Sequence, residues 1–118
     1  MAALAVGGIG IEAGIATTAE VDVLSASPFV PSVLRVLVEP GELDPTAAVA
    51  LAWSIEGALA RAGVTAPRLH HGVDAATWAV VATAAARSLS VRIGLEDVLT
   101  LPDGTPAAGN AELMAALA

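Results

Sequence analysis

The sequence of 118 residues contains no cysteine, no tyrosine and no lysine. Without cysteine the chain can form neither a disulfide framework nor a metal site built from thiolates. Its five basic residues, all arginine, are outnumbered by 12 acidic residues, so the net charge at pH 7 is −7. Nucleic-acid binding needs clustered lysine and arginine side chains that contact phosphates, and this charge balance therefore argues against a nucleic-acid partner.

Long hydrophobic runs are also missing, although 56% of the residues are hydrophobic and the mean hydropathy is +0.76. The longest stretches without a charge span residues 23–34 and 75–86, well short of the roughly 20 residues of a membrane-spanning helix. No basic residue precedes the first apolar run, which Glu12 interrupts, so no secretory signal is predicted. We therefore expect a soluble cytoplasmic protein with no membrane partner.

The hydrophobic pattern alternates short apolar runs with longer helical ones, which is typical of βα units and a parallel sheet. Strands are predicted at residues 8–13, 33–38, 68–72 and 90–95, and a helix is predicted after each of them. The strand at 33–38 is almost continuously aliphatic, as expected when both of its faces are covered. The predicted fold class is therefore α/β, with four βα units and parallel strands.

Capping residues mark several of the predicted helices. Asp44 is the expected N-cap of the second helix, with Pro45 at its first position and Gly63 just past its end. Asp74 and Asn110 are the expected N-caps of the third and fourth helices. An apolar stripe at helical spacing marks the buried side of the second helix: Ala48, Ala52, Ile55, Leu59 and Ala62.

The residues best suited to chemistry follow the last predicted strand, in the segment V-R-I-G-L-E-D from residue 91 to 97. Arg92 lies four positions before Glu96, and two-residue alternation along a strand would put both on one face. Gly94 between them would leave room for a ligand. Charged groups at the carboxyl end of a barrel strand must be paired or bound to a metal. An ion pair that merely closes the strand end is the structural alternative.

The R-x-G-L-E-D segment resembles the last barrel strand of the β-keto acid cleavage enzymes, the family of 3-keto-5-aminohexanoate cleavage enzyme. Other segments are similar to the same family and occur in the right order: G-I-E-A-G, L-R-V-L-V-E-P, A-P-R-L-H-H-G and A-T-W. The resemblance implies the C-terminal half of a (β/α)8 TIM barrel. Residues 1–118 would then form one partial domain containing strands five to eight, and the resemblance is weakest at residues 16–33.

The same resemblance implies the roles of individual residues. Glu96 matches a glutamate that binds a divalent metal, with zinc the expected ion. Asp97 matches the base that removes a proton from the substrate, and Arg92 matches the arginine that orients it. The implied reaction is metal-dependent cleavage of a small β-keto acid, in which acetyl-CoA as co-substrate yields acetoacetate and a new acyl-CoA. Glu12 resembles a third catalytic glutamate near the pocket, and a simple ion pair with Arg35 is its alternative.

The family's other metal ligands form an H-x-H pair, which this sequence lacks. His70 and His71 are adjacent, so strand alternation would direct them to opposite faces and they could not readily bind one ion together. We expect one to be hydrogen-bonded near a loop and the other to pack under a helix, with a ligand role for one of them as the alternative. Glu39 is expected to be structural or to cap a loop.

Two other interpretations compete with an enzyme. A non-catalytic half-barrel or interaction module would explain the missing histidines, and four strands with two open edges predict a homo-oligomer or a missing N-terminal half-barrel as partner. The string G-I-G-I-E-A-G could instead belong to a dinucleotide-binding βαβ domain. That string should then form a turn into a helix, and an acidic residue should end a second strand about 20 residues later, whereas Glu39 comes too late.

Overall fold

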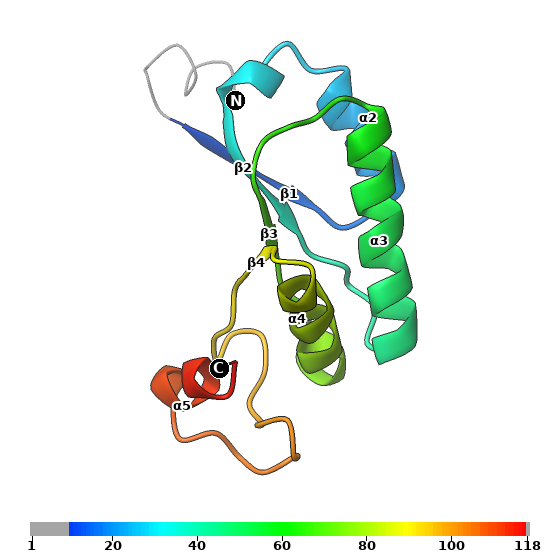
Figure 1. The fold of residues 1–118 in the computed structure, drawn as a ribbon. Coiled ribbons are helices and arrows are strands. Elements are labelled where there is room, and N and C mark those ends of the chain that lie inside the picture. The colour runs from blue at the N-terminus through cyan, green and yellow to red at the C-terminus, as the bar shows by residue number, and fades with distance from the viewer. Residues whose placement is uncertain (1–9, 118) are drawn as a thin grey trace.

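A computed structural model describes residues 10–117 and shows four strands, each followed by at least one helix (Figure 1). The strands are β1 (Ile11–Ile15), β2 (Val33–Val38), β3 (Arg68–His70) and β4 (Ser90–Val91). The α-helices are α2 (Thr18–Ser25), α3 (Pro45–Arg61), α4 (Thr77–Ala86) and α5 (Asn110–Ala115). Two short 3₁₀ turns, η1 (Val30–Ser32) and η2 (Asp74–Ala76), precede β2 and α4.

The four strands form one sheet in the order β1-β2-β3-β4, and each neighbouring pair is parallel. Helices α2, α3 and α4 lie on the same side of this sheet and pack against one another in sequence (Figure 1). The α/β prediction with four parallel strands is therefore confirmed. The opposite side of the sheet, here called the open face, is covered by none of these helices and includes Glu12, Gly14, Arg35 and Leu37.

Strand β2 has the predicted bounds and shows the alternation that places the core. Val36 and Val38 are completely buried against the helices, whereas Arg35 and Leu37 between them are partly exposed on the open face. The main core lies between the helices and the first two strands. Its buried members are Ile15, Val21, Leu24, Val33, Val36, Val38, Ala52, Ile55, Leu59 and Val64.

Helix α3 begins and ends as its capping residues predict. The Asp44 side chain accepts a hydrogen bond from the Ala47 N–H at 2.8 Å, and Pro45 occupies the first helical position. Gly63, just past the C-cap Ala62, has the positive φ of 74° that glycine adopts without strain. Four residues of the predicted stripe are buried, namely Ala48, Ala52, Ile55 and Leu59, whereas Ala62 is exposed.

Other predicted boundaries are wrong, and the backbone hydrogen bonds explain why. Strand β4 ends at Val91 rather than at residue 95, because the chain turns and the Asp97 N–H donates to the Gly94 carbonyl at 2.9 Å. Asp74 has φ 46° and does not cap α4; its own N–H donates to the Asp97 carbonyl at 2.7 Å. Strand β1 starts at Ile11, and residues 8 and 9 of the predicted strand lie outside the described residues.

The last segment packs around α4 and α5 rather than on the sheet core. A second cluster contains Val81, Ile93, Val98 and Leu113, with Trp78 packed against it. The Trp78 Nε1–H donates to the Thr100 carbonyl at 2.8 Å, which satisfies the indole N–H where the ring packs against this cluster. The N-cap of α5 is Gly109 rather than Asn110, whose side chain instead accepts from the Leu95 N–H at 2.8 Å.

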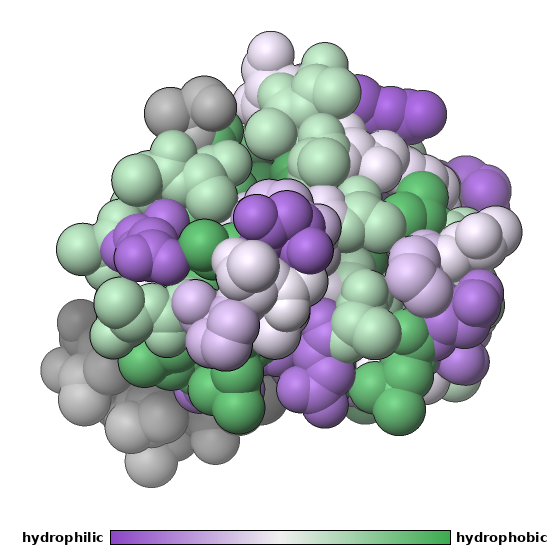
Figure 2. All heavy atoms as spheres, turned by 90° about the horizontal axis from the view of Figure 1, so that it is seen from below, coloured by the Kyte–Doolittle hydropathy of each residue, from purple (hydrophilic) through white to green (hydrophobic). Residues whose placement is uncertain are grey.

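The surface mixes apolar and polar side chains, which alternate over the face seen in Figure 2. The largest exposed apolar side chains within the described residues come from several elements: Val23, Leu34, Leu43, Leu95, Leu99 and Met114. Among the helices of residues 10–117, none combines the length and the apolar character needed to cross a bilayer.

Candidate active site

A two-point polar contact at the strand ends joins Arg92, which follows β4, to Asp97 in the next turn. Arg92 Nη2 lies 3.0 Å from Asp97 Oδ1 and Arg92 Nε lies 3.4 Å from Oδ2, so the guanidinium contacts both oxygens. The Asp97 side chain is 5% exposed. The hydrogen bond to Asp97, assisted by the charges of Asp97, Glu96 and Glu39, raises the pKa of Arg92 above its ordinary value and outweighs the opposing effect of burial.

The backbone of Asp97 is fixed by the start of α4. Its carbonyl accepts from the Asp74 N–H at 2.7 Å and from the Thr77 hydroxyl at 3.4 Å. This approach requires Gly72, because a Cβ there would come within 2.7 Å of Thr77 Cα. Asp97 is therefore fixed both by its backbone and by its side chain, which suits a group that must present one carboxylate in one orientation.

His71 and Glu39 complete what we call the strand-end cluster, consisting of Glu39, His71, Arg92 and Asp97. Val38 pairs with His70, and His70 with Val91, so the three residues that follow these positions lie beside one another. His71 Nε2 lies 2.8 Å from Glu39 Oε2, and His71 Nδ1 lies 3.5 Å from Arg92 Nη2 and 3.4 Å from Asp97 Oδ1. His71 is 5% exposed, so this imidazole is enclosed by charged partners.

Glu96 is close to this cluster but more exposed than its members. Its side chain is 60% exposed, and its nearest cation is Arg92, with Nε 4.0 Å from Glu96 Oε1. The predicted sharing of one strand face by Arg92 and Glu96 is wrong, because a turn rather than a strand brings them together. The room above Gly94 is also taken by Glu96 itself, since a Cβ there would come within 2.8 Å of the Glu96 Cδ.

The donor set does not complete a metal site. Within residues 10–117, no group of three His, Cys, Asp or Glu side chains is arranged to bind a metal ion. Both ring nitrogens of His71 already face other side chains. Glu96 could supply one carboxylate oxygen, but a zinc site needs at least two further protein ligands. The described residues therefore do not fit a metal by themselves.

Glu12 lies on the open face and pairs with Arg35, its register partner on β2, which matches the ion-pair alternative. A Cβ at Gly14 would lie 3.2 Å from the Glu39 Cδ, so Glu39 covers β1 on the side to which Glu12 points. The expectation that Glu39 is structural or a loop cap is therefore incomplete, because Glu39 joins the His71 network. Among the contacts of the described residues, none joins Glu12 to Arg92 or Asp97.

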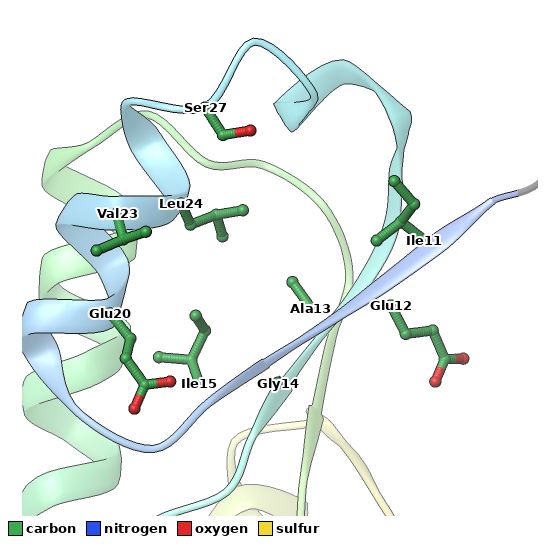
Figure 3. Close-up of a pocket in the computed structure, with 9 residues that line it drawn as sticks. All are labelled: Ile11, Glu12, Ala13, Gly14, Ile15, Glu20, Val23, Leu24 and Ser27. Atoms are coloured by element: carbon green, nitrogen blue, oxygen red, sulfur yellow. The ribbon is translucent and has the colours of Figure 1, made fainter. Parts of the chain in front are cut away.

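A cavity of about 540 Å³ lies elsewhere, between the free edge of β1 and α2. It is mainly apolar: the side chains of Ala13, Ile15, Val23 and Leu24 surround it, whereas Glu12 points away to the open face (Figure 3). No member of the strand-end cluster lines it. The cavity is therefore a gap in the packing between sheet and helices, separate from the strand-end cluster, although Glu12 and Glu20 contribute to its lining.

His70 points to the opposite face from His71, as strand alternation predicts. It is completely buried, and its Nε2 lies 2.8 Å from Glu56 Oε1 on α3. The His70 ring also packs against Trp53, with 5.5 Å between the ring centroids. The Arg87 Cζ lies 3.9 Å from the centroid of the Trp53 ring. Burial raises the pKa of Glu56, but the His70 hydrogen bond and the Arg68 charge outweigh it, and the net pKa is lowered. This pair fastens α3 to β3.

Comparison with known families gives one match. A sequence profile described as beta-keto acid cleavage enzyme matches residues 15–118, which is most of the chain. The chain belongs to the beta-keto acid cleavage enzyme family. No curated protein and no solved structure gives a significant match. The matched range includes Glu39, His71, Arg92, Glu96 and Asp97, so every member of the strand-end cluster lies in the family's domain.

The dinucleotide alternative is disfavoured by the structure of this family member. Residues 11–14 of the G-I-G-I-E-A-G string lie in strand β1, whereas a dinucleotide site needs a glycine turn that leads into a helix. The first glycine of the string, Gly8, lies outside the described residues. His71 and Glu39 are the cluster members that the sequence did not bring together. Aligning the strand ends at residues 38, 70 and 91 would have predicted their contact.

Proposed function

We propose that the sheet is the half of a (β/α)8 barrel that contains strands five to eight. Three observations support this: the strands follow chain order, all crossovers place their helices on one side, and within residues 10–117 no further strand pairs with the outer edges of β1 and β4. The radius of gyration of 15.0 Å exceeds the about 13–14 Å of a closed domain of this size. In such a barrel the open face would be the barrel interior, and the cavity beside β1 would be covered by the preceding βα unit.

The proposed reaction is cleavage of a small β-keto acid with acetyl-CoA, which yields acetoacetate and a new acyl-CoA. The observation that carries it is the Arg92–Asp97 contact at the carboxyl ends of parallel strands, where barrel enzymes place their catalytic groups. Asp97 would accept the substrate proton, and Arg92 would hold its carboxylate in place. Glu12, on the same face of the sheet, remains the third candidate catalytic residue.

Glu96 is the proposed ligand for a divalent metal, for which zinc is the expected ion. Its exposed carboxylate, with one cation at 4.0 Å, is available to an incoming ligand. Because the described residues supply no complete donor set, further ligands would have to come from outside them. A second copy of the chain or an N-terminal half-barrel would also cover the free edges of β1 and β4.

A non-catalytic half-barrel that acts as an interaction module is the second candidate. The incomplete donor set within residues 10–117 favours it, because the proposed chemistry depends on a metal. The two candidates differ in what they need: the enzyme requires a second source of ligands, whereas the module requires only a partner for its edges. They also differ in their dependence on the Asp97 carboxylate, because only the enzyme uses this side chain.

One experiment separates them. The 118-residue chain and the same chain extended by any coding sequence upstream of Met1 are purified and assayed for bound zinc and for acetoacetate released from β-keto acid and acetyl-CoA. We expect no activity from the chain alone, and metal with activity in the extended form. Asp97→Asn in that form should abolish acetoacetate release without changing the zinc content. Absence of activity from both forms would favour the interaction module.

A further inference from the structure

We propose that His71, fixed by Glu39, is a positioning residue that sets the guanidinium of Arg92 and through it the carboxylate of Asp97. The inference rests on the proposed function, in which Asp97 is the catalytic base. It adds two residues for which that function assigned no role. The atoms that carry it are Glu39 Oε2, the two ring nitrogens of His71, and Nη2 of Arg92.

A neutral His71 ring allows one arrangement of hydrogen-bond donors and acceptors in this cluster. The shortest contact of His71 is 2.8 Å from Nε2 to the Glu39 carboxylate, which can only accept, so Nε2 carries the hydrogen and donates it. In the neutral ring Nδ1 is then an acceptor for Arg92 Nη2 at 3.5 Å, whereas in a doubly protonated ring Nδ1 would instead donate to Asp97 Oδ1 at 3.4 Å. Glu39 thereby fixes the tautomer of His71, as carboxylates beside histidines commonly do.

Arg92 Nη2 has two hydrogens, and the cluster provides an acceptor for each of them. One points to His71 Nδ1, and the other to Asp97 Oδ1 at 3.0 Å. The Nε–H lies 3.4 Å from Asp97 Oδ2, a longer and weaker contact. Asp97 Oδ2 is therefore the less engaged oxygen, and it is the atom that we assign to proton transfer. Loss of His71 Nδ1 would free the guanidinium to rotate and would change which oxygen is exposed.

The burial of His71 and Asp97, and the lack of a side chain at Gly14, indicate that the fold itself determines this arrangement. His71 is 5% exposed and the Asp97 side chain is 5% exposed, so neither group can exchange its partner for bulk water at low cost. Gly14 on β1 leaves the space that the Glu39 side chain occupies. Glu39 itself is 34% exposed and could have turned to solvent, yet it lies against the imidazole.

The matched substitutions at position 71 separate the two contacts of the ring. Asparagine has an amide oxygen near the place of Nδ1 and can still accept from Arg92, whereas glutamine reaches toward Glu39 in the place of Nε2. In the extended form of the chain, we expect His71→Asn to retain most of kcat and His71→Gln to lose on the order of 10- to 100-fold in kcat, with KM within about twofold in both. Equal losses in the two variants would overturn the proposal.

His70 provides a control of the same chemistry on the other face, since its Nε2 also lies 2.8 Å from a glutamate. His70→Asn should lower the free energy of unfolding and leave kcat per folded molecule unchanged. A loss of kcat equal to that of His71→Gln would show that any weakened histidine–glutamate pair impairs the enzyme, and would contradict a positioning role.

A spectroscopic measurement on the 118-residue chain does not require enzymatic activity. The ¹⁵N shifts of the His71 ring at neutral pH should show a protonated Nε2 and an unprotonated Nδ1, and Glu39→Ala should populate the other tautomer. A protonated Nδ1 in the wild type would overturn the inference. Because this measurement is independent of acetoacetate release, an inactive extended form would count against the proposed function, and the ring nitrogens would still decide the positioning.

Discussion

Arg92 contacts both carboxylate oxygens of Asp97, although the two side chains differ greatly in exposure: 39% for Arg92 and 5% for Asp97. The buried carboxylate thus depends on a cation that reaches it from the surface. The loop after β4 should therefore keep this conformation, because a charged group that is removed from water must keep its partners.

Removing this cation should destabilise the fold. We expect Arg92→Ala to lower the free energy of unfolding by about 1–3 kcal/mol, because it leaves a buried carboxylate without its main partner. The value should lie at the lower end, since water can reach the space that the half-exposed arginine vacates. Arg92→Lys should recover only part of the loss, because lysine lacks the fork that contacts two oxygens. Urea unfolding measures each difference.

Arg61 in the last turn of α3 is the control for that experiment, because it is exposed on the helix surface. Arg61→Ala should change the free energy of unfolding by less than about 0.5 kcal/mol. A similar effect of both alanine substitutions would mean that loss of positive charge, rather than loss of the Asp97 contact, weakens this acidic protein.

The contact between Glu56 on α3 and His70 on β3 predicts that the free energy of unfolding depends on pH. The pKa of Glu56 is lowered from 4.5 in the folded state, because the His70 hydrogen bond and the Arg68 charge outweigh the effect of burial. The folded state therefore binds this proton more weakly than the unfolded chain. The stabilisation is fully present above pH 4.5 and is lost as the pH falls through the folded-state value.

Glu56→Gln should consequently be less stable than the wild type at about pH 7, and the difference should shrink at about pH 3. Urea midpoints at the two pH values test this. Glu42→Gln, in the exposed loop before α3, controls for the removal of one negative charge. A difference between Glu56→Gln and the wild type that stays constant down to about pH 3 would contradict the role of the Glu56 carboxylate.

The approach of α4 to the end of β3 depends on one glycine. A Cβ at Gly72 would lie 2.7 Å from Thr77 Cα, so Gly72→Ala must displace the helix start that fixes the Asp97 carbonyl. We expect a loss of about 1–3 kcal/mol in the free energy of unfolding. Gly41→Ala is the matched control, because no atom lies within 4 Å of its Cβ position and its φ is not positive. It should be neutral or slightly stabilising.

The sequence was most informative where the determinants are local. The bounds of β2 follow from its aliphatic run, and the start of α3 follows from Asp44 and Pro45, whose effects reach only a few residues. Asp74 and Asn110 look like caps by the same rules, yet they bond to Asp97 and Leu95, respectively, across a loop. A local pattern cannot reveal a partner that only the tertiary fold brings near.

In the candidate site too, the sequence predicted local features but not the tertiary contacts. The family motif indicated Arg92, Glu96 and Asp97, but it did not indicate that a turn joins them or that the Glu96 side chain fills the space above Gly94. His71 and Glu39 are 32 positions apart, and their contact depends on the register of β2 and β3. The register could have been predicted from the sequence, because parallel strands place their carboxyl ends at one edge of the sheet.

Neighbouring carboxylates at 96 and 97 should differ most clearly in their effect on stability. Glu96 is 60% exposed with its nearest cation at 4.0 Å, so Glu96→Gln should change the free energy of unfolding by less than about 0.5 kcal/mol. Asp97→Asn should cost about 1–3 kcal/mol, because the amide cannot satisfy Arg92 as the carboxylate does. In an active preparation, both variants should nevertheless lose acetoacetate release, and only Glu96→Gln should also lose bound metal. A carboxylate that is dispensable for stability but required for activity has its role in ligand binding. If Glu96→Gln were as destabilising as Asp97→Asn, Glu96 would be a structural partner of Arg92, and its assignment as a metal ligand would lose its physical basis.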